Sequence, residues 1–328
     1  MKKSALIFHN GIIDYAGLYP PAKLSLQDAL MNYSAGRHGK YSWILNRFVV
    51  GSGLLKEMDE YRDDVLAEGA PFRLSVVGTY VSTVEGYQQS IDDALFDIEH
   101  LHQPMPGWIA TEAFEIKLPD ETLKSEDPGL LEELIHETSS RFEQVEFAPE
   151  EIYYEMNLND RWKNEAEMVF QVLAQHQTDL DNHFEQSKTV GFKMRCGGVT
   201  KEYFPSVEQL AHIICLARDF TVPIKFTAGL HHPVRFYDEN LKIRMHGFWN
   251  VFGATMLAYT QGLEPEEIES ILEEEDVDAF TFTEEGFNCK RWSISMEEIE
   301  QLREVAALTF GSCSIDEPLD DLKSLNVI

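Results

Sequence analysis

Basic residues are scarce in this chain. Its 328 residues include 27 Lys and Arg against 57 Asp and Glu, a formal net charge of −30 at pH 7. A surface of this sign repels phosphate backbones, so we expect no nucleic-acid partner. The acidic residues gather in segments such as 264–269, 273–276 and 297–300. This is typical of exposed helix faces that keep a protein soluble.

Long apolar runs are also missing. No stretch approaches the roughly 18 apolar residues that span a bilayer, so we expect no membrane partner. The apolar stretch near the amino terminus, Ala5-Leu6-Ile7-Phe8, is about four residues long, whereas a signal peptide needs about 7–15. The sequence therefore predicts a cytoplasmic, unprocessed protein.

Cysteine and glycine motifs are absent as well. The four cysteines form no C-x-x-C pair, which argues against a disulfide framework or a zinc knuckle. Cys196 and Cys313 are therefore interpreted as small buried hydrophobic residues. No G-x-G-x-x-G or G-x-x-x-x-G-K-[ST] follows an early strand, and H-E-x-x-H is absent. These absences argue against a nucleotide-binding open sheet and against a thermolysin-like metal site.

What the sequence does contain is an alternation of strand and helix patterns. Strands are predicted at 42–50, 72–78, 112–118, 151–157, 189–196, 223–228 and 278–283, with a short eighth strand near 309–310. Helices are predicted from residue 25 and at 83–101, 129–141, 163–186, 206–220, 245–259, 265–275 and 295–308. Such alternation predicts parallel strands joined by right-handed crossovers. We therefore expect a single-domain (β/α)8 barrel over 42–328 with an amino-terminal extension over 1–41, and an open doubly wound sheet is the alternative.

Several predicted strands carry charge with a period of two. Buried parallel strands are normally apolar on both faces. Because helices require apolar partners, the charged face of each strand should point into the barrel. The residues assigned to this cavity are Glu115, Lys117, Glu155, Asn157, Lys193, Arg195, Lys225 and Thr227, together with either Arg47 or Asn46. Their excess of cations favours a small anionic metabolite, a carboxylate or a phosphate, as the ligand. An internal ion-pair network without a ligand is the alternative.

Two lysines on neighbouring strands suggest covalent chemistry. Lys193 and Lys225 are predicted on adjacent strands. A lysine near other cations in a dry pocket has a lowered pKa and can attack a carbonyl carbon. The sequence thus predicts that Lys225 or Lys193 forms a Schiff base, with Glu155 or a nearby histidine moving the proton.

These two strands resemble those of a known class of enzymes. The segments Ile224-Lys225-Phe226-Thr227-Ala228-Gly229 and Phe192-Lys193-Met194-Arg195-Cys196-Gly197-Gly198 resemble the two lysine strands of deoxyribose-phosphate-aldolase-type barrels, in reversed order along the chain. The resemblance implies a class I aldolase. Segments 226–235 and 310–318 also resemble a set of bacterial proteins without an assigned activity, which implies a fold but no reaction.

Loops at the carboxyl ends of barrel strands carry further candidates. His231 and His232 follow one predicted strand and are interpreted as a general acid or base. Substrate-binding roles are also assigned to Arg235, to His246 and Asn250 one helical turn apart, and to Gly197 and Gly198, where no Cβ blocks a ligand.

Three functions follow from these residues. The first is a lyase of aldolase type without an organic cofactor. The second is a metal-dependent hydrolase or lyase with ligands from Glu155, His231, His232 and His246. The third is a barrel that binds a metabolite without turnover. The sequence leaves a divalent metal and self-association to a homo-oligomer open, and it does not place the extended segment 14–22.

Overall fold

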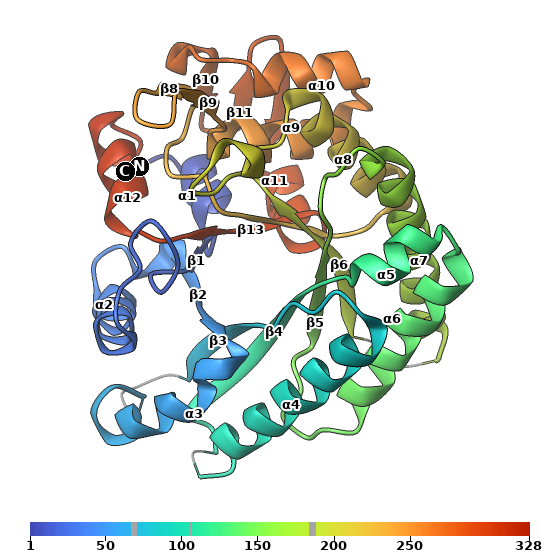
Figure 1. Cartoon of the computed structure of the whole chain (residues 1–328). Helices are drawn as coiled ribbons and strands as arrows, with labels where there is room; N and C mark the ends of the chain where they lie inside the picture. The colour runs from blue at the N-terminus through green and yellow to red at the C-terminus, as the bar shows by residue number, and fades with distance from the viewer. Residues whose placement is uncertain (67–70, 105, 184–187) are drawn as a thin grey trace. The chain divides into compact units, whose positions relative to one another are not determined.

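The structure of the chain, a computed structural model, describes residues 1–66, 71–104, 106–183 and 188–328 (Figure 1). Eight parallel strands of this described part close into a barrel in the order β1-β13-β7-β6-β5-β4-β3-β2. They are β1 Ile13–Tyr15, β2 Leu45–Gly51, β3 Phe72–Val77, β4 Ile109–Lys117, β5 Glu151–Glu155, β6 Thr189–Arg195, β7 Ile224–Thr227 and β13 Ala307–Ser312. The predicted (β/α)8 fold is therefore confirmed.

Helices alternate with the barrel strands. They are α1 Lys3–His9, α2 Leu26–His38, α3 Leu55–Met58, α4 Val84–His102, α5 Asp120–Ser125, α6 Pro128–Glu143, α7 Trp162–His183, α8 Val207–Phe220, α9 Phe248–Gln261, α10 Pro265–Leu272, α11 Met296–Val305 and α12 Asp316–Ser324. Ser206 is the N-cap of α8 and forms a capping box with Gln209: the Ser206 hydroxyl accepts from the Gln209 N–H, and the Gln209 side chain accepts from the Ser206 N–H. The predicted helix 163–186 corresponds to α7, and its last residues lie outside the described part. None of the helices in the described ranges combines the length and apolarity of a membrane span.

Contacts divide the chain into two compact units. Unit 1 comprises Met1–Lys23, Gly36–Asn46 and Met194–Ile328, and unit 2 comprises Leu24–Ala35 and Arg47–Lys193. In unit 2, α6 packs between α4 and α7 (Figure 1). In unit 1, α8, α9 and α10 pack against one another.

The outward faces of the strands are apolar, as helix packing requires. In unit 2, Phe114 of β4 contacts Phe142 of α6, with ring centroids 5.1 Å apart. In unit 1, Phe226 of β7 contacts Phe252 of α9 at 5.3 Å. Because side chains alternate along a strand, Glu115 and Lys225 lie on the opposite, inward faces.

Two predicted strand assignments are wrong. The barrel begins with β1, inside the segment predicted as an extension, and β2 is its second strand. The predicted strand 278–283 lies outside the barrel, because β10 Phe280–Phe282 pairs antiparallel with β11 Gly286–Cys289, which pairs with β12 Trp292–Ser295. Phe280 and Phe282 are buried while Thr281 is exposed, the pattern of an antiparallel sheet with one covered face. A second small hairpin joins β8 Phe236–Asp238 and β9 Ile243–Met245.

Candidate functional site

A buried charge cluster in unit 2 centres on Lys193. Its Nζ lies 2.9 Å from Glu155 Oε2 on β5 and 2.9 Å from Glu115 Oε2 on β4. The parallel register pairs Glu155 directly with Lys193. Ser75 of β3 donates a hydrogen bond of 2.5 Å to the other oxygen of Glu115. Neighbouring strands thus hold one ammonium group between two carboxylates.

The electrostatics of this cluster differ from the expectation. Burial by itself disfavours the ammonium form, but the Glu115 and Glu155 carboxylates outweigh burial and raise the pKa of Lys193. The predicted lowering of its pKa is therefore wrong. In the resting protein the Lys193 side chain is therefore an ammonium ion. A nearby carboxylate must remove its proton before the nitrogen can react.

A second buried cluster lies in unit 1 and centres on Asp14. The Asp14 carboxylate pairs with Lys225 and accepts hydrogen bonds from Asn46 Nδ2 at 2.8 Å and Thr309 Oγ1 at 2.7 Å. The side chains of Lys225 and Asp14 are 1% and 0% exposed. Strands β1, β7 and β13 and the first residues of β2 contribute to this network. Of the two alternatives on β2, Asn46 reaches Asp14.

Arg47 instead lies in an ion-pair network near the amino-terminal ends of the unit 2 strands. Its Nε is 2.9 Å from Glu112 and its Nη2 is 2.6 Å from Glu151, and Arg73 also binds Glu112, at 2.7 Å. A pocket of about 560 Å³ opens beside these residues. In (β/α)8 barrels this end supports stability rather than catalysis. The contacts of Arg47 account for its burial without a bound anion.

Lys117 and Asn157 lie at the opposite, carboxyl ends of the unit 2 strands. Lys117 is the last residue of β4, and its Nζ donates to Asn157 Oδ1. The same Nζ lies 4.5 Å from the centre of the Tyr80 ring. Lys117 is half-buried and Asn157 is exposed. A cation thus stands at the end of the barrel where substrates bind in this fold.

The segment after β6 owes its glycines to close packing. A Cβ on Gly197 would lie 2.7 Å from the Gly229 Cα, and one on Gly198 would lie 2.7 Å from the Tyr203 Cβ. Arg195 donates to the Gly197 carbonyl at 3.2 Å and stacks on Tyr203. These contacts explain both glycines without a ligand.

Two other predicted residues at these strands lie within packed surroundings. Thr227 lies opposite Gly311 of β13, where an added Cβ would approach its hydroxyl oxygen to 3.0 Å. Cys196 is fully buried and burial raises its thiol pKa, in accordance with the interpretation of this residue as a small hydrophobe.

The half-buried Arg235, in the loop after β7, contacts two buried residues, His246 and Asn250. His246 Nδ1 accepts from Arg235 Nη1 at 3.2 Å, and its Nε2 donates to the Pro205 carbonyl at 2.9 Å. Asn250 accepts from the Arg235 backbone N–H and donates to the carbonyls of Ile271 and Glu274, each at 2.8 Å. Both ring nitrogens of His246 are thus engaged in hydrogen bonds.

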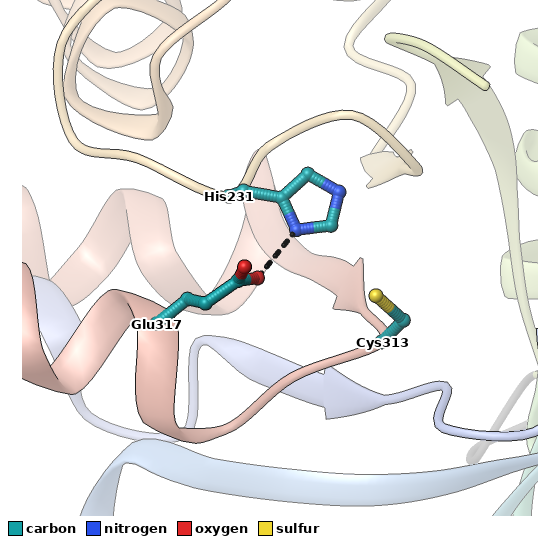
Figure 2. A group of neighbouring side chains, drawn as sticks. All are labelled: His231, Cys313 and Glu317. Atoms are coloured by element: carbon teal, nitrogen blue, oxygen red, sulfur yellow. Dashed lines mark hydrogen bonds and ion pairs between the residues drawn. The ribbon is translucent and has the colours of Figure 1, made fainter. Parts of the chain in front are cut away.

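The adjacent histidines both bind α12. His231 Nδ1 lies 3.1 Å from Glu317 Oε2, and His232 Nδ1 lies 2.6 Å from Asp321 Oδ2. Cys313, which follows β13, joins the first pair: one ligand atom each of His231, Cys313 and Glu317 lie within 4.8 Å of one another (Figure 2). Burial lowers the pKa of His231, although Glu317 opposes this effect.

No protein-family model matches this chain, and a search of curated proteins finds no match.

The sequence patterns did not single out Asp14, Ser75, Thr309, Glu317 or Asp321, and they did not place Cys313 in a cluster. One feature of the sequence could have indicated Asp14: it is the single charged residue within the apolar run Ile12-Ile13-Asp14-Tyr15. Ser75 and Glu317 had no such feature, since a lone serine or an acidic residue in an acidic helix is ordinary. Lys193 belongs to unit 2, whereas Lys225, His231 and His246 belong to unit 1.

Proposed function

We propose that this chain is a (β/α)8 lyase that acts on a small anionic carbonyl compound through a Schiff base on Lys193. The observation that carries the proposal is the position of Lys193 between two carboxylates, 2.9 Å from each, on the inward faces of the strands. The resemblance of the β6 segment to a lysine strand of aldolase barrels points the same way.

The two carboxylates suit an iminium intermediate. A protonated Schiff base carries its positive charge on the same nitrogen as the resting ammonium. Glu115 and Glu155 therefore stabilise the iminium as they stabilise the ammonium. Their spacing also provides a proton acceptor next to the nucleophile, within the reach that general base catalysis needs.

The reaction balances without an oxidant or a reductant. Glu155 takes a proton from Lys193, and the neutral nitrogen adds to the carbonyl carbon. The oxygen receives this proton back from Glu155 and a second proton from the attacking nitrogen, leaves as water, and an iminium forms. The Glu155 carboxylate then takes the proton of a hydroxyl group on the carbon β to the iminium carbon. The carbon–carbon bond to this carbon breaks, the hydroxyl-bearing fragment leaves as the first carbonyl product, and the electron pair of the bond converts the iminium into an enamine. Protonation of the enamine carbon and hydrolysis release the product and restore Lys193.

Lys193 is favoured over Lys225 because of exposure. The Lys193 and Glu155 side chains are 8% and 11% exposed, whereas those of Lys225 and Asp14 are 1% and 0% exposed. A substrate carbonyl needs access to the nitrogen. In this proposal Glu155 is the general acid and base, since Glu115 is held by Ser75 and is 1% exposed.

The negative charge proposed for the substrate is inferred from the Lys117 ammonium group. Lys117 lies on the same inward-facing series of β4 as Glu115, two residues closer to the carboxyl end. A carboxylate or phosphate of the substrate would bind Lys117 while the carbonyl carbon meets Lys193 below it.

Borohydride trapping tests the proposal. The protein is incubated with a panel of 2-oxo acids and sugar phosphates and reduced with borohydride, and the modified residue is located by peptide mass spectrometry. We expect an adduct on Lys193 with at least one compound, absent from Lys193→Met and retained in Lys163→Arg, which changes an exposed lysine. An adduct on Lys225, or none on Lys193 with any compound, contradicts the proposal.

A further inference from the structure

Three side chains from two segments of unit 1 meet beside the carboxyl ends of β7 and β13. His231 lies in the loop after β7, Cys313 directly follows β13, and Glu317 lies in the first turn of α12 (Figure 2). One ligand atom from each lies within 4.8 Å of the other two. The Schiff-base proposal uses none of these residues.

We propose that Cys313 Sγ, His231 Nδ1 and a Glu317 carboxylate oxygen bind a divalent ion of the zinc type. Thiolate, imidazole and carboxylate are the three ligand types that zinc takes in proteins. In the described part of the chain the group contains three such residues. A tetrahedral ion would thus keep one position for water or a small ligand, as in catalytic zinc sites.

The distances fit this geometry. Two nitrogen or oxygen ligands about 2.0–2.1 Å from a tetrahedral ion are separated by roughly 3.3 Å. The separation between His231 Nδ1 and Glu317 Oε2 is 3.1 Å. In a tetrahedral site the sulfur ligand would lie roughly 3.6 Å from the nitrogen ligand. The three ligand atoms lie within 4.8 Å of one another, so the Cys313 sulfur needs to move by at most about an ångström to reach this separation.

The surroundings favour a cation over an anion. The first turn of α12 carries Asp316 and Glu317, and Asp320 and Asp321 follow one turn later. This acidic helix would repel a phosphate and attract a divalent ion. His232 binds Asp321, one helical turn beyond the His231–Glu317 contact. This second contact holds the loop after β7 against α12 without a metal.

Cobalt titration tests the site. Full-length protein without an affinity tag is stripped with a chelator and titrated with Co²⁺, whose thiolate charge-transfer band reports a sulfur ligand. We expect one equivalent to produce the band and Zn²⁺ to abolish it by displacement. Zn²⁺ competition with a chromophoric chelator then gives affinities. Cys313→Ser and His231→Gln should weaken binding at least about 100-fold, and Glu317→Gln, whose side chain is 52% exposed, about tenfold.

Cys215→Ser is the matched control, since Cys215 is 8% exposed and Cys313 9%. It should retain the band and the affinity. Circular dichroism of the metal-free variants checks that each is folded.

Alkylation provides a second measurement. Zinc should slow the reaction of Cys313 with iodoacetamide and leave Cys215 unchanged. No charge-transfer band, a band that survives in Cys313→Ser, or equal alkylation of Cys313 with and without zinc overturns the proposal. Rapid alkylation of Cys313 in metal-free protein at neutral pH also overturns it, in favour of a cysteine nucleophile. None of these results bears on borohydride trapping at Lys193, so the two proposals fail separately.

Discussion

Asp14 and Lys225 form a buried ion pair between residues 211 positions apart in the sequence. The pair links β1, the shortest strand of the barrel, to β7 within unit 1. Asn46 and Thr309 donate to the same carboxylate, so its charge is compensated from three sides. Removal of one partner leaves the other charge buried and unpaired, which costs more than the pair contributes.

Single and double substitutions at this pair should therefore differ. We expect Lys225→Met to lower the free energy of unfolding by about 3–5 kcal/mol. The double variant Asp14→Asn/Lys225→Met should lose less than the sum of the single variants, because it removes both charges. Urea denaturation followed by circular dichroism measures each value. Additive losses would show that the two side chains are not coupled.

The proton acceptor next to Lys193 can be tested through pH. Glu155 is one of the two carboxylates that raise the Lys193 pKa, so Glu155→Gln should lower this pKa. Borohydride trapping at Lys193 should then reach its half-maximal rate at a lower pH than in the unaltered protein. The exposed Glu146→Gln is the control and should leave the profile in place. An unchanged profile in Glu155→Gln would remove the electrostatic basis of the proposed reaction.

Buried histidines predict a loss of stability in mild acid. Burial lowers the pKa of His246 from 6.5 to about 4, and Arg235 adds to this effect. The unfolded chain binds a proton near pH 6.5, whereas the folded chain does so only near pH 4. Stability from this group is therefore complete above about pH 6.5 and is lost as the pH falls toward 4, about 3 kcal/mol in all.

Urea midpoints at pH 7, 5.5 and 4.5 measure this dependence. His246→Gln should be less stable than the unaltered protein at pH 7 and should lose less stability between pH 7 and 4.5. His9, whose pKa burial lowers to about 3, will keep part of the acid dependence in both proteins. A slope that does not change in His246→Gln would contradict the assignment of a neutral imidazole.

The glycines after β6 and β7 should be needed for packing. Gly229 has a φ of +74°, and its added Cβ would lie 2.7 Å from the Gly197 Cα and 2.9 Å from the Cys196 carbonyl oxygen. We expect Gly229→Ala to destabilise the protein by about 1–3 kcal/mol, since backbone atoms cannot move aside easily.

Gly53→Ala is the matched substitution, because an added Cβ there meets nothing within 4 Å. It should change the free energy of unfolding by less than about 0.5 kcal/mol. Equal effects of the two substitutions in thermal unfolding would show that the close approach at Gly229 is not what requires glycine.

The sequence by itself determined the class of fold and the strand faces. Helix and strand periods alternate along the chain, and polar side chains recur two residues apart within single strands, as in Glu115/Lys117, Lys193/Arg195 and Lys225/Thr227. These are local properties, so β4, β6, β7 and helices such as α8 could be predicted from them.

Tertiary structure alone decided which strands close the barrel and which charges meet. Three residues, Ile13–Tyr15, are too few to show a period, yet β1 completes the barrel. The pattern at 280–282 looked like a barrel strand, but pairing with β11 places it in a separate sheet. Whether a buried lysine faces another lysine or a carboxylate depends on strand register, which sequence spacing does not contain. Because the register places carboxylates beside Lys193, its pKa is raised and not lowered. Cys313 and Glu317 likewise meet His231 only in the folded chain.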